Sequence, residues 1–335
     1  MSMDIVIAGF GTVGQGVAEA IGLRKDMIRE TFGREARIVA AFDSRSAIHS
    51  EDGLDPAVLL SNKAAGQVGD EPLVDGVAFL ESIDYDVLVE VSPTNIETGG
   101  AGLHHIRSAL SNGRHVVTVN KGPLALAFGE LDRLAKENGV EMRYEGSVGG
   151  AMPIINLCRE SLMGQNITSV MGILNGTCNF ILSRMDDGLP FEQALKEAQE
   201  LGYAETDPSY DINGVDTACK VVILANSVFG IDCDYDDVDV SGITAITEEA
   251  VAMASDQNYC IRLIGEISPD RLEVSPRLIS KGHPLSVTGT LNVAQVNTDL
   301  AGPISISGRG AGRMETASAI LSDLLAIMRS NVNNK

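Results

Sequence analysis

The sequence DIVIAGFGTVGQGVAEAIG, residues 4–22, decides the fold of the first part of the chain. Asp4–Ala8 is a short apolar run of the kind that forms a buried parallel strand. Gly9, Gly11 and Gly14 follow in the spacing G-x-G-x-x-G, and a helical pattern continues from them. Such glycines allow a tight turn, a close approach of backbone to a pyrophosphate and close packing of helix on strand. The stretch therefore predicts a Rossmann dinucleotide-binding domain.

The turn itself supplies the predicted cofactor contacts, because the unsatisfied N–H groups of a helix N-terminus would face the phosphates. The residues are Gly9, Phe10, Gly11, Thr12, Val13 and Gly14. The alternative is an ordinary glycine-rich turn, but the motif's position directly after a clean strand favours a cofactor site.

A second strand, Arg37–Phe42, is predicted to end at Asp43. A carboxylate here would hold the 2′-hydroxyl of the adenosine ribose, whereas Arg45 would attract a 2′-phosphate. The spacing from Gly14 exceeds the usual value of about 20 residues, which a longer first helix through 24–31 would explain. NAD and NADP both remain open as cofactors.

Further apolar runs extend the predicted parallel sheet, with strands at 86–91, 115–119 and 141–144 and helices at 103–111 and 131–138. Between the second and third strands, residues 44–76 are expected to be irregular surface with one short helix. Ligands of open α/β sheets bind at the carboxyl ends of the strands. This rule places three more residues beside the cofactor, namely Ser92, Thr94 and Lys121.

The pattern changes from Ile154 onward, and a mixed α+β domain is predicted there. Its expected strands are 169–174, 272–279 and 291–296, and an amphipathic helix at 315–328 ends the chain. We expect a dinucleotide-binding domain at 1–130, completed by 305–335, and a second domain at 131–304. The predicted fold class is α/β, with a Rossmann domain plus an α+β domain.

The residues 202–220, GYAETDPSYDINGVDTACK, carry the strongest chemical signal of the second domain. A helix at 191–201 is predicted to stop at Gly202. Lys220 is the only basic residue in the apolar run 215–229, and burying an unpaired ammonium costs several kcal/mol. Asp216 lies four residues earlier, within reach for pairing on a helix. The alternative is a surface ion pair worth about 0.3–0.5 kcal/mol, but the apolar flanks favour a functional site.

Composition narrows the class of protein. The chain has 335 residues, enough for about two domains, and 46 acidic against 25 basic residues give a formal net charge of −21. This balance argues against nucleic-acid binding and anionic membranes. Five cysteines without a CxxC pair indicate reduced thiols. Without a signal peptide or an apolar run of 18 residues, a soluble, cytoplasmic protein is expected.

One further stretch suggests a cation. Glu145 begins the glycine-rich turn EGSVGGAMP at 145–153, where a carboxylate and outward carbonyls could hold a hard ion. A single carboxylate favours a monovalent ion over calcium. The histidines have no metal-ligand spacing and are interpreted as structural or surface residues.

These motifs together resemble the homoserine dehydrogenases along nearly the whole chain. The matching stretches are GFGTVG at 9–14, SPTN at 92–95, TVNKGPLA at 118–125, EGSVGGAMP at 145–153, NGTCN at 175–179, GYAETDPSYDINGVDTACK at 202–220 and GRGAG at 308–312. The resemblance implies NAD(P)-dependent interconversion of L-aspartate 4-semialdehyde and L-homoserine, on the route to threonine, methionine and isoleucine. It also implies a homodimer formed through the second domain.

Residue roles follow from the same resemblance. The catalytic group would be Lys220, Lys121 and Asp216, and either lysine could donate the proton. Substrate-binding residues would be Glu205, Asp211, Gly202, Asn175 and Thr177. A sodium ion would be held by Glu145 and by the carbonyls of Val148, Gly150 and Met152. The segment 308–312 would return to the nucleotide domain and bring Gly310 to the cofactor.

Two alternatives compete with this interpretation. One is a phosphorylating aldehyde dehydrogenase with Cys178 as thiolate nucleophile, although no histidine lies near Cys178 in sequence. Cys178 stands where a second threonine is common in the resembled family, which leaves its local role open. The other is a dinucleotide sensor with an inert second domain, which the lysine–carboxylate cluster disfavours. No kinase or regulatory domain is expected beside these two domains, so feedback inhibition through such a module is not expected either.

Overall fold

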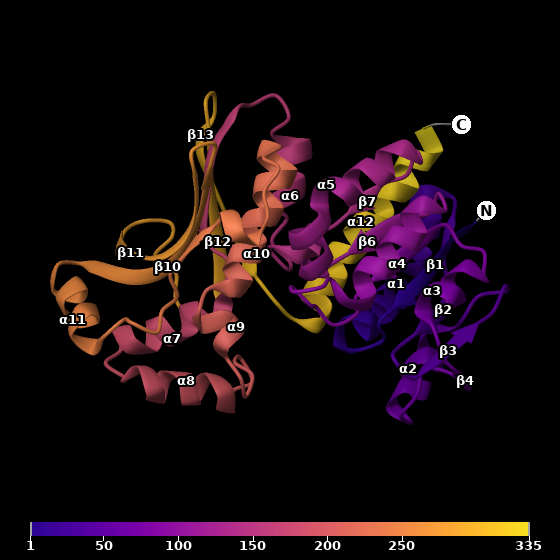
Figure 1. Ribbon diagram of the computed structural model, residues 1–335, viewed down its shortest axis with the longest axis horizontal. Coiled ribbons are helices and arrows are strands. Elements are labelled where there is room, and N and C mark those ends of the chain that lie inside the picture. The colour runs from indigo at the N-terminus through magenta and orange to yellow at the C-terminus, as the bar shows by residue number, and fades with distance from the viewer. Residues whose placement is uncertain (1, 334–335) are drawn as a thin grey trace. The chain divides into compact units, whose positions relative to one another are not determined.

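The computed structural model describes residues 2–333, which form two compact units with one sheet each (Figure 1). Among these residues, the first unit comprises 2–147 and 312–333, and the second comprises 148–311. The first unit thus extends beyond residue 130, because α5 (Lys121–Glu137) and β7 (Met142–Arg143) belong to its layers. It resumes at Gly312 rather than 305, since residues 302–309 form a strand of the second sheet.

The first sheet is the parallel sheet expected from the glycine motif. Its order is β4-β3-β2-β1-β5-β6-β7. The parallel strands are β1 (Ser2–Ala8), β2 (Glu35–Phe42), β5 (Val87–Glu90), β6 (His115–Thr118) and β7. The chain builds outward from β1 to β2 on one side and from β5 to β7 on the other. The carboxyl ends of β1 and β5 therefore flank the point where the strand order reverses, at which α/β sheets bind ligands.

The segment 44–76 is less irregular than predicted. It contains α2 (Pro56–Ala64), which is the expected short helix, and two short edge strands, β3 (Ser46–His49) and β4 (Glu71–Pro72). β3 pairs antiparallel with β2 and β4 with β3. A four-residue strand and a two-residue strand are too short to show alternation of apolar and polar residues, so pairing with β2 decides their structure.

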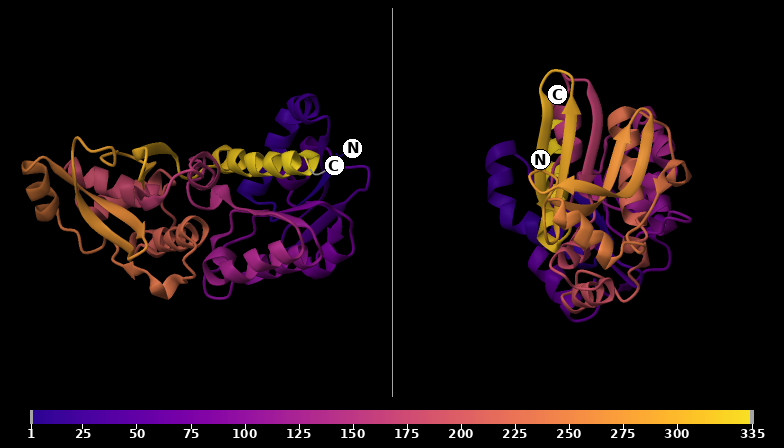
Figure 2. Two further views of the ribbon diagram at one scale, coloured as in Figure 1. Left: turned by 90° about the horizontal axis from the view of Figure 1, so that it is seen from above. Right: turned by 90° about the vertical axis from the view of Figure 1, so that its left-hand side faces the viewer.

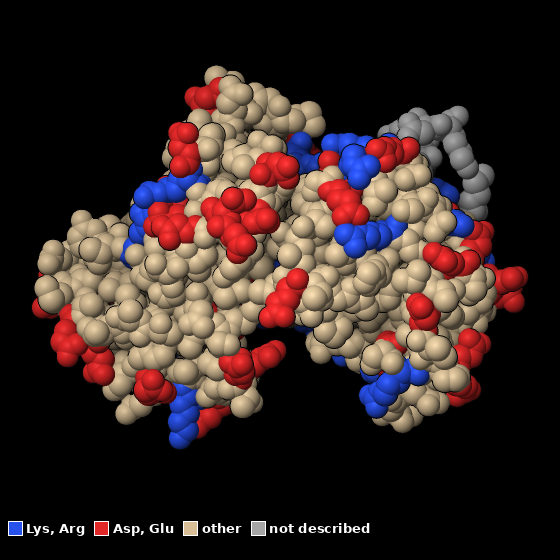
Figure 3. Space-filling model, in the orientation of Figure 1, with Lys and Arg blue, Asp and Glu red and all other residues tan. Residues whose placement is uncertain are grey.

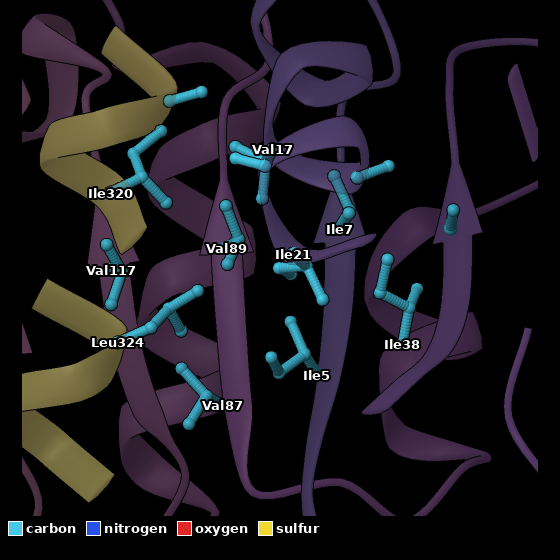
Figure 4. Packing of buried hydrophobic residues seen from close by; sticks show 14 of the residues in the cluster. Ile5, Ile7, Val17, Ile21, Ile38, Val87, Val89, Val117, Ile320 and Leu324 are labelled. Atoms are coloured by element: carbon cyan, nitrogen blue, oxygen red, sulfur yellow. The ribbon is translucent and has the colours of Figure 1, made fainter. Parts of the chain in front are cut away.

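Helices cover both faces of this sheet (Figure 2). On one face, α1 (Thr12–Phe32) and α12 (Arg313–Asn333) contribute Val17, Ile21, Ile320 and Leu324 to the core over the central strands (Figure 4). On the other face, α3 (Gly76–Glu81) and α4 (Gly100–Ser111) pack on β2: the rings of Phe79 and His105 each meet Phe42 edge to face. The last helix of the chain thus completes the first unit.

The glycines of the motif have distinct roles in this packing. A Cβ on Gly14 would lie 2.1 Å from the carbonyl oxygen of Gly9, so only glycine lets α1 approach β1 this closely. A Cβ on Gly11 would meet no atom within 4 Å. The space at Gly11 is therefore open to a ligand, as the motif predicts.

The second unit has a six-stranded, largely antiparallel sheet of order β13-β12-β8-β10-β11-β9. Its strands are β8 (Ile167–Ile173), β9 (Asp239–Val240), β10 (Tyr259–Ser268), β11 (Arg271–Ser280), β12 (Leu291–Thr298) and β13 (Gly302–Arg309). The strands β8, β11 and β12 match the predicted ones. β10 is largely apolar on both faces but contains the buried Arg262 and the half-buried Glu266, and β13 begins with Gly-Pro, so neither showed a clear strand pattern.

The helices of this unit are α6 (Ile154–Asn156), α7 (Gly176–Asp186), α8 (Phe191–Glu200), α9 (Ser209–Ile212), α10 (Val215–Leu224) and α11 (Glu248–Asp256). α10 packs on the sheet at Gly265, where a Cβ would lie 3.0 Å from Val221 and 3.2 Å from Thr217. On the opposite face, Met171, Ile173 and Val293 pack with Leu285 of a long loop.

The surface is acidic over both units: Figure 3 shows Asp and Glu spread across the visible face, with fewer Lys and Arg between them. In residues 2–333, no helix combines the length and the apolar character needed to cross a membrane.

Candidate functional site

The first part of the site lies at the carboxyl edge of the first sheet. Gly9 has φ +96°, a left-handed conformation that favours glycine, and its N–H donates to the Phe42 carbonyl at 2.9 Å. A Cβ on Gly9 would lie 2.6 Å from the Ser92 nitrogen. The loops that follow β1, β2 and β5 therefore converge at Gly9.

The remaining residues of the motif lead into α1. Phe10 is buried in the core, whereas Gly11 and Thr12 are exposed at the start of the helix. Gly11 occupies the N-cap position without a capping side chain. The first N–H groups of α1 are thus available to an anion, as the sequence predicted.

Asp43 follows β2 and is held by three donors. Its carboxylate accepts from Lys63 Nζ at 2.5 Å and from the backbone N–H groups of Arg45 and Ser46 at 2.8 and 3.0 Å. Burial opposes ionisation of Asp43, but the Lys63 hydrogen bond and the two N–H groups outweigh it and lower the pKa of Asp43. The sequence analysis missed Lys63, which lies on α2, twenty residues further along.

The other predicted cofactor residues lie at the next two strand ends. Ser92 lies two residues after the end of β5, and Thr94 is exposed two residues later. Lys121 is the first residue of α5, behind β6, rather than part of a loop. Its half-buried side chain belongs to the first unit.

The second part of the site is the lysine–carboxylate cluster of the second unit. Lys220 is only 6% exposed. Its Nζ donates to Asp216 Oδ2 at 2.7 Å and to the carbonyl of Leu174 at 2.6 Å. Because Lys220 and Asp216 are buried, they do not form the surface ion pair considered from sequence. The apolar residues that flank them on α10 are the physical cause of this burial.

Asn175 joins the two carboxylates of the cluster. Its Nδ2 donates to Asp211 Oδ1 at 2.7 Å and to Asp216 Oδ2 at 2.9 Å. Its Oδ1 accepts from the N–H of Cys178 at 2.8 Å, which caps α7. One side chain thus starts a helix and fixes both acids.

The cluster carries an excess of negative charge. Burial, and then repulsion by Asp216, raise the pKa of Asp211, although Asn175 and Lys220 act in the opposite direction. Asp216 pairs with the Lys220 ammonium, and Asp211 is near enough to feel its charge. This balance suits a ligand with a positively charged group.

Cys178 lacks the properties of a thiolate nucleophile. Its thiol is buried and donates to the carbonyl of Asp211 at 3.2 Å. Burial, followed by the nearby Asp211 and Asp216, raises the pKa of Cys178 well above its ordinary value. Reactive cysteines need the opposite, an electropositive and accessible setting, so the structure disfavours the alternative of an acyl-enzyme.

The remaining predicted substrate residues lie around the cluster at different depths. Thr177 donates through Oγ1 to the carbonyl of Tyr203 at 2.7 Å. Gly202 adopts φ +74° after α8. Glu205 is exposed, and its backbone carbonyl accepts from Gln199 Nε2 at 3.1 Å. The structure therefore groups Asn175, Asp211, Asp216 and Lys220, while Glu205 lies at the surface.

Asn292 was missed by the sequence analysis. It is fully buried on β12, and its Nδ2 donates at 2.9 Å to the same Leu174 carbonyl that accepts from Lys220. A Cβ on Gly310 would lie 2.0 Å from this nitrogen, so Gly310 packs directly on Asn292. The available signal was an amide in the otherwise apolar start of a predicted strand.

The residues of the predicted sodium site fall in both units. Glu145 is buried in the first unit, where its N–H donates to Asp323 Oδ2 at 2.9 Å. Val148 and Met152 are buried in the second, with Gly150 between them at φ +59°. Within residues 2–333, no group of three or more His, Cys, Asp or Glu side chains is arranged to hold a metal ion.

Comparison with known proteins gives matches over both units of the chain. The family model described as homoserine dehydrogenase matches residues 153–325, and the homoserine dehydrogenase NAD-binding domain matches residues 9–145. A homoserine dehydrogenase of Methanocaldococcus jannaschii is 50% identical, with 98% of this chain and 99% of the relative covered.

Solved structures give the same result. The crystal structure of a putative homoserine dehydrogenase from Archaeoglobus fulgidus has a TM-score of 0.91 at 49% identity, covering 97% of this chain and 99% of that one. A hyperthermophilic archaeal homoserine dehydrogenase in complex with NADPH has a TM-score of 0.86 at 30% identity, with 98% of each chain covered.

The raised pKa of Asp211 predicts a pH-dependent cost in stability. As the pH rises above the ordinary value of 3.8, the unfolded chain releases a proton that the folded state still holds, so Asp211 contributes less stability as the pH rises. Asp211→Asn should therefore raise Tm at pH 7, and the gain should shrink toward pH 4. Thermal melts across this range would measure it.

Asp207→Asn is the matched control, because Asp207 is exposed and its hydrogen bonds to Ser209 lower its pKa. This change should not raise Tm. A fall in Tm for Asp211→Asn at pH 7 would contradict the assigned electrostatic strain.

Proposed function

The chain belongs to the homoserine dehydrogenase family, and we propose here which of its residues carry out that family's reaction. The protein is an NAD(P)-dependent oxidoreductase that interconverts L-aspartate 4-semialdehyde and L-homoserine. The observation that supports the residue assignment is the cluster of the buried Lys220, Asp216 and Asn175 with the half-buried Asp211.

NAD(P)H, when bound at the glycine motif, supplies the hydride that the aldehyde carbon accepts. We propose that Lys220 donates a proton from Nζ to the carbonyl oxygen as its negative charge develops, and removes that proton in the reverse direction. Asp216 Oδ2 and the Leu174 carbonyl each accept a hydrogen bond from the ammonium. These two bonds fix the direction of its third N–H. Asn292 Nδ2 donates a second hydrogen bond to the same Leu174 carbonyl.

The substrate's α-ammonium suits the excess negative charge of this cluster. We propose that Asp211 binds it, with Asn175 fixing the carboxylate and Thr177, Gly202 and the exposed Glu205 forming the surroundings. Lys121 is proposed, from the resemblance, to bind the substrate carboxylate, and it remains the alternative proton donor.

Replacing Lys220 tests its role as acid and base. Lys220→Ala should lower kcat by roughly 10²–10⁴-fold, the usual contribution of a general acid. Lys220→Arg should not restore the rate, since guanidinium keeps its proton near neutral pH and differs in shape. Asp216→Asn should also slow turnover by disturbing the position of the ammonium. Steady-state kinetics and a cofactor titration would measure the effects.

Cofactor affinity should barely change in Lys220→Ala, because the glycine motif lies in the first unit. Cys178→Ser serves as the control and should keep most of the activity without phosphate or coenzyme A. A near-normal kcat in Lys220→Ala would show that Lys220 is not the general acid, and Lys121 would then be the leading candidate.

The ion pair between Asp43 and Lys63 offers a basis for cofactor choice. We propose that Asp43 meets the adenosine ribose and repels a 2′-phosphate, while Lys63 and Arg45 attract one. Asp43→Ala should free the ammonium of Lys63 and raise affinity for NADP relative to NAD. Lys63→Ala should move the ratio in the opposite direction. Dissociation constants for both cofactors would decide this, and an unchanged ratio in both variants would remove Asp43 from the ribose.

Ser92, Thr94 and Gly310 complete the proposed cofactor contacts. The support for Ser92 and Thr94 is their position at the end of β5, next to the strand-order reversal. Gly310 is proposed from the resemblance alone, since it lies in the second unit.

We also propose a sodium ion held by Glu145 with the carbonyls of Val148, Gly150 and Met152. A buried carboxylate fits a cation, although the Met152 carbonyl already accepts from the N–H of Ile154 at 2.9 Å. Sodium chloride should raise Tm above that in choline chloride at equal ionic strength, and Glu145→Gln should abolish the difference. Equal melting in the two salts would leave the ion without support.

A homodimer is proposed through the open face of the second sheet. Met171 and Gln295 are half-buried neighbours across β8 and β12, on the face opposite α10. A second copy would cover this row. Sedimentation at micromolar concentration should give twice the mass of one chain, and Met171→Glu should shift it toward the monomer. A monomer at all concentrations would rule the dimer out.

Its proposed setting is the cytoplasm, in the synthesis of threonine, methionine and isoleucine. The five free cysteines of the structure agree with a reducing compartment. Rescue of a homoserine-requiring strain would support this role. Failure of an expressed, active protein to rescue that strain would contradict it.

A further inference from the structure

Glu90 is a fully buried carboxylate at the point where β5 ends. It accepts hydrogen bonds from Ser92, through both the backbone N–H at 2.8 Å and the hydroxyl. His105 Nδ1 lies 2.8 Å from its second oxygen, and Asn120 Nδ2 lies 3.4 Å from its first. Four polar groups from three segments thus converge on one side chain.

Burying a carboxylate is costly, and a well-packed apolar residue usually stabilises a core as much or more. The three residues before Glu90 are valine, leucine and valine, so an apolar side chain would continue the strand pattern. The carboxylate instead satisfies groups that belong to the ligand-binding edge. Its position points to a role in arranging that edge.

The segments that it joins are the loops after β5 and β6. Asn120 is buried, and besides Glu90 its amide donates to the Ser92 carbonyl at 3.2 Å. The Thr118 hydroxyl donates to the Glu90 carbonyl at 2.9 Å and accepts from the Asn120 N–H at 3.0 Å. Lys121 follows Asn120 directly. Glu90 therefore restrains Ser92 and Asn120, the residue that precedes Lys121.

Helix α4 closes over this arrangement. A Cβ on Gly102 would lie 2.4 Å from Asn120 Nδ2 and 3.1 Å from Glu90 Oε1. His105, one turn further along α4, contacts Glu90 Oε2 through Nδ1, and its ring packs on the Phe42 ring. The cluster is thus held from the helix layer as well as from the strands.

The sheet order indicates which half of the cofactor these loops would meet. The glycine motif after β1 faces the pyrophosphate, and Asp43 after β2 lies on the adenosine side. β5 and β6 lie on the other side of β1. Their loops therefore face the nicotinamide half.

We propose that Glu90, held in place by His105, is a positioning residue that fixes the Ser92 loop and the start of α5 at Lys121 to receive the nicotinamide half of NAD(P). It acts through Ser92 and Asn120 rather than by touching the reacting atoms. The inference rests on the cofactor site proposed above.

The variant Glu90→Gln keeps the shape of the side chain. Its amide has one oxygen to accept the hydrogen bonds that the two carboxylate oxygens of Glu90 now accept. Binding of NADH and NADPH can be followed by the fluorescence of their reduced nicotinamide rings. Affinity for the reduced cofactor should fall about tenfold, the usual effect of losing a hydrogen bond to a charged group. ADP-ribose, which lacks nicotinamide, should compete as well as it does for the wild type.

Two substitutions of His105 separate the hydrogen bond from packing. His105→Asn can still donate to Glu90 from near the position of Nδ1, whereas His105→Leu cannot. Only His105→Leu should weaken NAD(P)H binding. Asp186→Asn, which breaks the buried pair with Arg262 in the second unit, is the control that lowers Tm without changing cofactor affinity.

Equal weakening of NAD(P)H and ADP-ribose in Glu90→Gln would show a general structural role and overturn the proposal. Unchanged binding of both would also overturn it. A wild-type protein that bound ADP-ribose but no NAD(P)H would instead refute the cofactor site itself.

Discussion

The buried pair of Lys220 and Asp216 is the interaction on which the second unit's chemistry depends. An ammonium and a carboxylate can be buried only if their remaining hydrogen-bonding capacity is satisfied. Asn175, through its amide, and Leu174, through its carbonyl, meet this requirement. Both lie directly after β8, so the end of that strand and the first turns of α10 must stay in register. The same contacts leave Asp211 close to Asp216, with the electrostatic strain that suits a cationic substrate.

In the first unit, the ligand-binding edge is arranged by close backbone packing and by a buried carboxylate, Glu90. Close packing at Gly14 brings α1 to β1, and the open space at Gly11 leaves its first N–H groups for phosphate. Glu90 then joins the next two strand ends, where backbone and hydroxyl groups would otherwise be buried without partners. In both units a buried carboxylate organises neighbouring loops. Asp216 does so beside an ammonium, and Glu90 does so among neutral and imidazole donors.

Prediction succeeded where a local pattern carried the information. The parallel strands at 4–8 and 37–42 and the helix over 215–229 follow from runs of apolar residues whose period is visible in sequence. β10 and β13 could not be found in this way. The apolar run of β10 fits a buried helix as well as a strand, and β13 is defined by pairing with β12. The short strands β3 and β4 depend likewise on their partners.

The sequence by itself determined the family, the dinucleotide motif and the lysine within the apolar run 215–229, because each depends on residues close together in the chain. Tertiary structure alone decided which distant groups meet. Lys63 reaches Asp43, Asn292 shares the Leu174 carbonyl with Lys220, and His105 and Asn120 converge on Glu90. Such contacts join residues 15 to 118 positions apart. They arise from the packing of strands and helices, which no local period records.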